Sequence, residues 1–167
     1  VTDLLYKCYG QAILDDDREE DFEEILKVIK DRYDSIINGL ELTISLDDEF
    51  KTIQENFSKK IGRDYAASRG EYLNGIIMAA YLGYEFIDAA EVIFFDEEGE
   101  FDAEKTNEVL SERLAHTERA VIPGFYGSNP DGTIHTFSRG GSDITGSIVA
   151  RAVHADMYEN WTDVSGF

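Results

Sequence analysis

Short apolar, strand-like segments alternate with helix-like segments after about residue 66, and this alternation constrains the fold more than any other feature of the sequence. The segments follow one another as a helix at 69–82, strands at 84–88 and 92–95, a helix at 103–114, an apolar run at 120–123, a strand at 133–137, a helix at 144–153 and a strand at 157–161. Such alternation is typical of parallel strands joined by crossover helices. It predicts a layered α/β/α sandwich with a mainly parallel sheet.

The first third of the chain has the periodicity of amphipathic helices. Apolar residues recur at helical spacing over 22–40 and again over 46–61. No internal repeat, low-complexity segment or flexible linker marks a boundary. We therefore expect a single, partial domain over 1–167, with a mainly helical subregion at 1–65 and the alternating α/β part at 66–167.

The charge and the cysteine content exclude several classes of protein. Acidic side chains outnumber basic ones by 35 to 15, which gives a formal net charge of −20 without a basic cluster. We therefore expect no nucleic-acid partner, since Lys and Arg meet the phosphates, and no anionic membrane partner. There is no signal-peptide pattern and no apolar run long enough to span a bilayer. The single cysteine, Cys8, fits a reducing compartment, so the sequence predicts a cytoplasmic protein.

Three loops are expected at the edge of the sheet where ligands bind. In open α/β sheets, ligands lie at the carboxyl ends of the strands. The segments that follow Pro123, Phe137 and Trp161 each leave a strand-like run. Their expected convergence is the main structural indication of a site.

The segment Ser138–Asp143 reads Ser-Arg-Gly-Gly-Ser-Asp and lies between a strand and a helix. Its glycines allow the backbone to approach a ligand closely, and the helix start presents free N–H groups to an anion. Arg139 adds a planar fork that can grip a carboxylate. Alternatively, Ser142 or Asp143 simply caps the helix after a glycine turn. The residues alone leave both interpretations open.

Two further segments carry a similar ambiguity. Ser68 and Glu71 have the spacing of a capping box. Gly70, however, costs a helix about 1 kcal/mol relative to alanine, which makes sense if another group lies against the backbone. Near the chain end, Thr162 and Asp163 either bind polar ligand groups or belong to an ordinary loop.

The remaining candidates give weak signals for chemistry. His116, His135 and His154 are far apart and have no cysteine or carboxylate at zinc-site spacing, so we expect no metal site among them. The chain also has no nucleophile elbow and no P-loop. Cys8 lies in an apolar helical start and is expected to be a small core residue.

Four segments together resemble the aspartate kinases, which belong to the amino-acid kinases. They are RGEYLN at 69–74, PGFYGSN at 123–129, SRGGSD at 138–143 and WTDVSGF at 161–167, in the order and at the separations of that family. The opening VTDLL is similar to the segment after the family's second strand. The resemblance covers essentially the whole chain and implies the amino-acid kinase fold.

The resemblance also implies a reaction and a set of residue roles. Aspartate kinases transfer the γ-phosphoryl group of ATP to the β-carboxylate of L-aspartate, with Mg²⁺ bridging the phosphates, as the first step towards lysine, threonine and methionine. By motif, Arg139 holds the substrate α-carboxylate, and Glu71 and Asp143 face its ammonium group; Arg139 and Asp143 are the expected catalytic residues. The other expected positions are Thr2, Phe125, Gly140 and Ser142 at the substrate and Thr162 and Asp163 at the nucleotide.

The chain departs from the family's pattern at its start. The family opens with a Lys–Phe/Tyr–Gly–Gly segment whose lysine contacts the transferring phosphate, and no such segment occurs here. We therefore expect a part of an aspartate kinase that is inactive alone and whose full-length parent is a homo-oligomer. Two other interpretations stay open: an amino-acid kinase with a different carboxylate acceptor, and a non-catalytic regulatory or interaction module with this fold.

Overall fold

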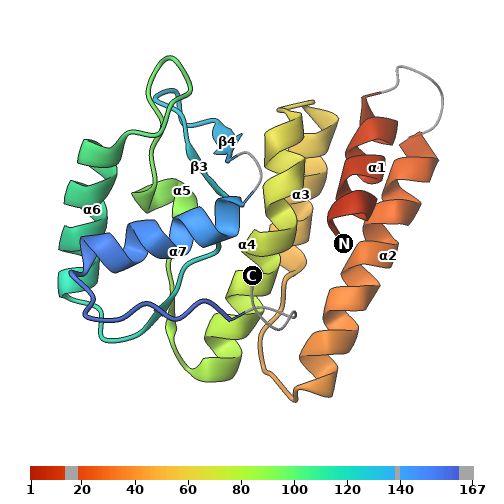
Figure 1. The fold of residues 1–167 in the computed structure, drawn as a ribbon. Coiled ribbons are helices and arrows are strands. Elements are labelled where there is room, and N and C mark those ends of the chain that lie inside the picture. The colour runs from red at the N-terminus through yellow and green to blue at the C-terminus, as the bar shows by residue number, and fades with distance from the viewer. Residues whose placement is uncertain (14–18, 138–139, 162–167) are drawn as a thin grey trace.

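The computed structural model describes residues 1–13, 19–137 and 140–161. In Figure 1 the helices α1 to α4 stand side by side, and the later helices and short strands form a second, mixed body beside α4. In chain order the elements are α1 (Thr2–Ala12), α2 (Glu19–Gly39), α3 (Asp47–Ser58), α4 (Arg63–Leu82), β1 (Glu85–Phe86), α5 (Ala89–Val92), α6 (Ala103–Ala115), β2 (Ala120–Val121), β3 (Tyr126–Ser128), β4 (Ile134–Thr136) and α7 (Gly141–Ala152).

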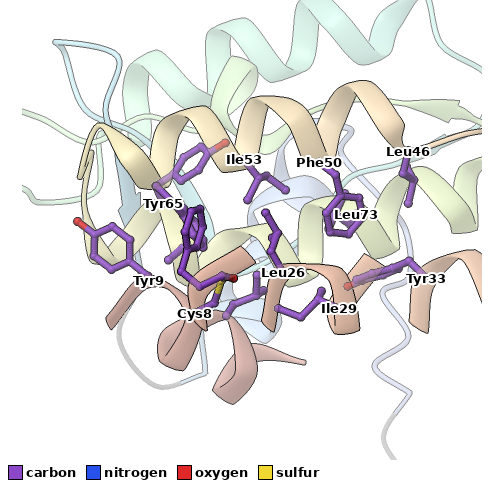
Figure 2. Packing of buried hydrophobic residues seen from close by; sticks show 14 of the residues in the cluster. Cys8, Tyr9, Leu26, Ile29, Tyr33, Leu46, Phe50, Ile53, Tyr65 and Leu73 are labelled. Atoms are coloured by element: carbon purple, nitrogen blue, oxygen red, sulfur yellow. The ribbon is translucent and has the colours of Figure 1, made fainter. Parts of the chain in front are cut away.

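The helical body has an apolar core to which all four helices contribute. Figure 2 labels ten of its buried side chains: Cys8, Tyr9, Leu26, Ile29, Tyr33, Leu46, Phe50, Ile53, Tyr65 and Leu73. Full burial of a large apolar side chain contributes about 1.5–3 kcal/mol, so this core stabilises the body strongly. The two amphipathic patterns predicted from the sequence are confirmed as α2 and α3, which direct their apolar faces into the core.

Helix α4 lies between the two bodies and is buried on most of its sides. Its residues 65–70 are all buried in succession, unlike those of an amphipathic surface helix. It packs against α1 and α3 of the helical body and against β1, β2 and β4 of the mixed body. Near its start, Asp64 accepts a hydrogen bond from the N–H of Thr136 at 3.0 Å. Helix α4 therefore joins the two bodies.

The start of α4 corrects the sequence prediction. The helix begins at Arg63 rather than near residue 69, so Ser68 lies inside it and donates its hydroxyl hydrogen to the carbonyl of Tyr65 at 2.8 Å. The capping-box interpretation of Ser68 and Glu71 is therefore wrong. Small residues such as Ala66 and Ala67 carry no apolar spacing signal, which is why periodicity missed the first turns.

The strands of the described residues form two small sheets. β1 and β2 pair in parallel, with Glu85 opposite Ala120, whereas β3 and β4 form an antiparallel pair with Gly127 opposite His135. A parallel bridge from Phe94 to Ser128 connects β3 to the segment after α5. The expected α/β class with a parallel strand pair and a helical first third is confirmed, and the antiparallel pair is an addition that the sequence did not predict.

Of the predicted strands, the one at 92–95 is only partly confirmed and the one at 157–161 is wrong. At 92–95, Asp88 caps a short helix by accepting the N–H of Ala90 at 3.0 Å, so that Val92 ends α5 and only isolated bridges follow. The segment 157–161 forms no strand, because it pairs with no strand that the structure describes. Conversely, β3 lies in the predicted loop after Pro123, where Gly127 and Ser128 have little strand propensity.

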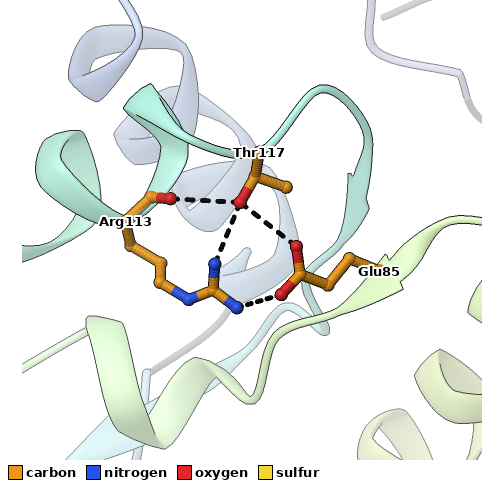
Figure 3. Close-up of polar contacts among 3 residues, drawn as sticks. All are labelled: Glu85, Arg113 and Thr117. Atoms are coloured by element: carbon orange, nitrogen blue, oxygen red, sulfur yellow. Dashed lines mark hydrogen bonds and ion pairs between the residues drawn. The ribbon is translucent and has the colours of Figure 1, made fainter.

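A polar network on the surface ties α6 to β1. Figure 3 shows the Arg113 guanidinium bonded to the Glu85 carboxylate and, at 2.9 Å, to the hydroxyl of Thr117. The Arg113 hydrogen bond holds the pKa of Glu85 below its ordinary value. Exposed pairs of this kind contribute little to stability because water screens them, so the network orients α6 more than it stabilises it. Along the described part of the chain, we find no helix with the length and apolarity needed to cross a membrane.

The packing around Gly127 generates a test of the mixed body. A Cβ at this position would lie 2.5 Å from the carbonyl oxygen of Ile93, so Gly127→Ala should lower the free energy of unfolding by about 1–3 kcal/mol. The control is Gly10→Ala in α1, where a Cβ meets nothing within 4 Å and a gain of about 0.5–1 kcal/mol is expected. Urea unfolding of both variants measures the difference. A Gly127→Ala chain as stable as the parent would contradict the close approach of β3 to Ile93.

Candidate functional site

The predicted site residues that the structure describes fall into two groups, one where α1 packs against α4 and one around the start of α7. The first group is Thr2 and Glu71, with Gly70 between them. The Thr2 hydroxyl oxygen lies 3.6 Å from the position that a Cβ on Gly70 would take, and Leu5 lies at the same distance. Both are ordinary van der Waals distances, so α1 packs beside Gly70 without requiring a glycine there, and the expectation that a group lies against its backbone stays a prediction.

Glu71 is a half-buried carboxylate beside a tyrosine. Burial raises its pKa above the ordinary value. The Tyr33 hydroxyl donates to the carbonyl of Gly70 at 3.1 Å, and burial together with the charge of Glu71 raises the pKa of Tyr33 to about 12. Among the described residues, no Lys or Arg forms an ion pair with Glu71. The positive charge of the Val1 α-amino group, however, acts on Glu71 and lowers its pKa against the larger effect of burial.

The second group surrounds the start of α7. Gly140 precedes this helix with a φ of 81°, and Ser142 and Asp143 in its first turn are exposed. Gly124 packs against Ser142 so closely that a Cβ on it would lie 3.0 Å from the Cα of Ser142. Phe125 packs in the same way against Gly141. The predicted convergence of the loops after Pro123 and Phe137 is thus confirmed for the part of them that the structure describes.

Two cavities flank the start of α7. One of about 550 Å³ is lined by Gly124, Ser142, Tyr158 and apolar residues of α7 and the segment after it. The other, of about 390 Å³, lies between α6 and α7 and is lined by Phe101, Asp143, Ile144, Arg151 and their neighbours. Asp143 also accepts a hydrogen bond from the side-chain amide of Asn160 at 3.0 Å. The segment before Trp161 therefore runs along α7, next to the other two loops.

The two groups are not joined by direct contacts. Within the described ranges, no hydrogen bond or ion pair connects Thr2 or Glu71 to Phe125, Ser142 or Asp143. That Glu71 and Asp143 face one ammonium group therefore stays a prediction. Arg139, Thr162 and Asp163 lie outside the described residues, so the roles expected for them stay predictions.

Sequence reasoning missed the cluster of aromatic rings around Arg69. This buried guanidinium lies 4.5 Å from the ring centre of Tyr65, 4.3 Å from that of Tyr72 and 5.5 Å from that of Tyr126. The hydroxyl of Tyr126 in turn donates to Asp88 at 2.7 Å. The cluster links α4 to β3 and so sets the two groups relative to each other. The signal that could have indicated it is the helical spacing of Tyr65, Arg69 and Tyr72, which places both rings on the same face as the arginine.

The described residues offer no ready protein site for a metal ion. They contain no group of three or more His, Cys, Asp or Glu side chains arranged to hold one. His135 instead stacks on Phe95, with the ring centres 4.4 Å apart. What the described geometry offers is a half-buried carboxylate on one side, and a helix start with exposed polar side chains on the other.

Comparisons with known proteins point to one family. A model of the amino acid kinase family matches residues 10–167. Aspartokinase 3 from Bacillus subtilis (strain 168) is 36% identical over 179 residues, which cover 98% of this chain and 38% of that protein. The crystal structure of Clostridium acetobutylicum aspartate kinase is 50% identical with a TM-score of 0.92, over 100% of this chain and 38% of that one.

A more distant structure shares the fold. Aspartokinase III from E. coli, solved in complex with aspartate and ADP, is 23% identical with a TM-score of 0.79, over 99% of this chain and 40% of that one. The chain thus spans about two fifths of the length of these relatives. Since the family model covers all but the first turns of α1, the chain belongs to the amino acid kinase family.

Proposed function

We propose that this chain is the substrate-binding part of an aspartate kinase, which transfers the γ-phosphoryl group of ATP to the β-carboxylate of L-aspartate. The observation that carries the proposal is the likeness to the Clostridium acetobutylicum aspartate kinase, at 50% identity and a TM-score of 0.92 over the whole chain. The motifs at 69–74, 123–129, 138–143 and 161–167 support the same conclusion. In this proposal residues 1–167 form one partial kinase domain.

The residues have complementary tasks in this proposal. Aspartate is a zwitterion with a further carboxylate, so a pocket for it needs a cationic fork and an anionic partner. Arg139 grips the α-carboxylate with two hydrogen bonds, while Glu71 and Asp143 attract the ammonium group. Thr2, Phe125, Gly140 and Ser142 line the pocket. Because phosphoryl transfer depends on positioning and charge, no protein nucleophile is required.

The proposal gives ATP contacts with the protein but gives Mg²⁺ no protein ligand. Thr162 and Asp163 border ATP in this proposal. The described residues do not fit a protein-held Mg²⁺, since no cluster of three ligands occurs among them. Mg²⁺ commonly keeps several waters and binds through substrate phosphates, so we propose that it binds together with ATP rather than to the described side chains.

The proposal also covers the cellular location and the oligomeric state of the protein. We infer a cytoplasmic protein, since the lone thiol of Cys8 is buried in the core and needs no oxidising compartment. Burial raises the pKa of this thiol to about 12, so it is no nucleophile in the proposed reaction. From the family resemblance we also propose that the full-length protein is a homo-oligomer.

Removing the guanidinium of Arg139 tests the proposed function. Arg139→Ala should weaken L-aspartate binding by about 2–5 kcal/mol, the usual cost of truncating one partner of a buried, hydrogen-bonded charge pair. Calorimetric titration of the chain with L-aspartate measures this loss. The control is Arg32→Ala, at an exposed position of α2, which should bind as the parent does. Equal affinities of the parent and Arg139→Ala for L-aspartate would show that Arg139 does not contact this substrate.

Replacing Glu71 by glutamine separates binding from stability. Because burial raises the Glu71 pKa, the charged carboxylate costs stability at neutral pH, and this cost disappears as the pH falls below the ordinary value of 4.5. Glu71→Gln should therefore melt higher than the parent near neutral pH and equally at about pH 4, yet bind L-aspartate more weakly. Glu112→Gln, at an exposed position of α6, controls for the change in net charge. A Glu71→Gln chain with full affinity would show that this carboxylate does not meet the substrate ammonium.

A further inference from the structure

We propose that Thr145 is a positioning residue: its hydroxyl locks the loop at 123–125 onto the glycine loop before α7 and thereby shapes the substrate pocket. This inference rests on the proposed function, because the pocket it concerns is the proposed aspartate pocket. Nothing in the sequence motifs singles out Thr145.

The hydroxyl of Thr145 bridges two segments. Its oxygen accepts a hydrogen bond from the N–H of Phe125 at 3.1 Å, and its hydrogen is donated to the carbonyl of Gly141 at 2.8 Å. A hydroxyl has a single hydrogen to donate and also accepts, so both of its functions are used. The side chain is 3% exposed, which shields the bridge from competing water.

The backbone of Phe125 needs this bridge. Its φ is 84°, a left-handed conformation that is strained for a residue with a side chain. Two hydrogen bonds hold it there: the N–H donates to Thr145, and the carbonyl accepts the N–H of Phe137 at 2.8 Å. Phe137 directly precedes the Ser-Arg-Gly-Gly-Ser-Asp segment. One strained residue is therefore tied to the chain before the glycine loop and to the helix after it.

The packing leaves the two segments no spare room. A Cβ on Gly141 would lie 2.8 Å from the Cβ of Phe137 and 3.1 Å from the Cα of Phe125, and one on Gly124 would lie 3.2 Å from the Ser142 hydroxyl. The backbones of the two loops thus touch directly. A small movement of Phe125 must displace Gly141 or Ser142, so the bond from Thr145 fixes the position of the loops relative to each other.

Thr145 acts through its neighbours rather than on the substrate. Phe125, Gly140 and Ser142 are the proposed pocket residues on this side, and they lie on the two segments that Thr145 joins. The single hydrogen of the hydroxyl is already donated to Gly141, and the residue is 3% exposed, so the hydroxyl cannot donate to a ligand while this bond is made. Its loss should therefore change the affinity for aspartate by moving the pocket walls.

The test compares three variants of the full 167-residue chain. Thr145→Val keeps the shape and removes the hydroxyl, and Thr145→Ser keeps the hydroxyl. Thr106→Val is the matched control, because Thr106 is fully buried in α6 and its hydroxyl oxygen accepts the N–H of Phe94 at 2.9 Å, away from Phe125. Should Thr145→Val fail to fold, Thr145→Cys replaces it, since a thiol is a weak hydrogen-bonding partner.

Two measurements are made on each variant. Amide hydrogen exchange followed by NMR reports the protection of the Phe125 N–H, and calorimetry reports the dissociation constant for L-aspartate. In Thr145→Val, we expect Phe125 to exchange at least about tenfold faster and aspartate to bind about tenfold more weakly. Thr145→Ser should restore both values. Thr106→Val should expose the Phe94 amide and leave Phe125 and aspartate binding unchanged.

Three results would overturn the inference. The first is unchanged protection of Phe125 in Thr145→Val, and the second is unchanged aspartate affinity despite lost protection. The third is an equal loss of affinity in Thr145→Val and Thr106→Val, which would mean a general loss of stability. A folded parent chain that binds no aspartate would instead count against the proposed function, while the exchange data would still decide whether Thr145 holds Phe125.

Discussion

The burial of α4 is the constraint on which the rest of the structure depends. A helix that is buried at residues 65–70 in succession needs neighbours on several sides, and it finds them in α1 and α3 and in the strands of the mixed body. Arg69 brings a buried charge into this helix, which is tolerated because aromatic rings and the Ser68 hydroxyl surround its guanidinium. Such cation–π contacts gain strength where water is excluded. Helix α4 is thus the element against which both bodies pack (Figure 1).

The division of the candidate site into two groups of residues follows from this arrangement of the two bodies around α4. Glu71 lies on α4 itself and meets α1, whereas Phe125 and Ser142 lie on the far body, where Thr145 and Phe137 hold them. Arg69 reaches across to Tyr126, the residue that follows Phe125. In the proposed function these two groups are two walls of one aspartate pocket, and Glu71 and Asp143 both attract the ammonium group of the substrate.

Much of this could be predicted from the sequence, and the failures have physical causes. The helices α2 and α3 were predicted because their apolar residues recur at helical spacing. The start of α4 was missed because small residues give no spacing signal, and β3 because Gly127 fits only through its close packing against Ile93. The predicted strand at 157–161 was wrong, since strands depend on partners that local pattern cannot supply. At the site, the two adjacent glycines of the glycine loop are visible in the sequence. The left-handed backbone of Phe125 and its hydrogen bond to Thr145 depend on tertiary packing, so they could not be predicted from local pattern.

The measurement that tests the central claim most directly is a competition between acceptors. The chain would be titrated calorimetrically with L-aspartate, L-glutamate and N-acetyl-L-glutamate under the same conditions. The account predicts that L-aspartate binds most tightly, since the pocket is matched to a free ammonium group and a short side chain. N-acetyl-L-glutamate, which lacks the charged ammonium group, should bind least. Tighter binding of L-glutamate or N-acetyl-L-glutamate by the folded chain would contradict the account and indicate an amino acid kinase with a different acceptor.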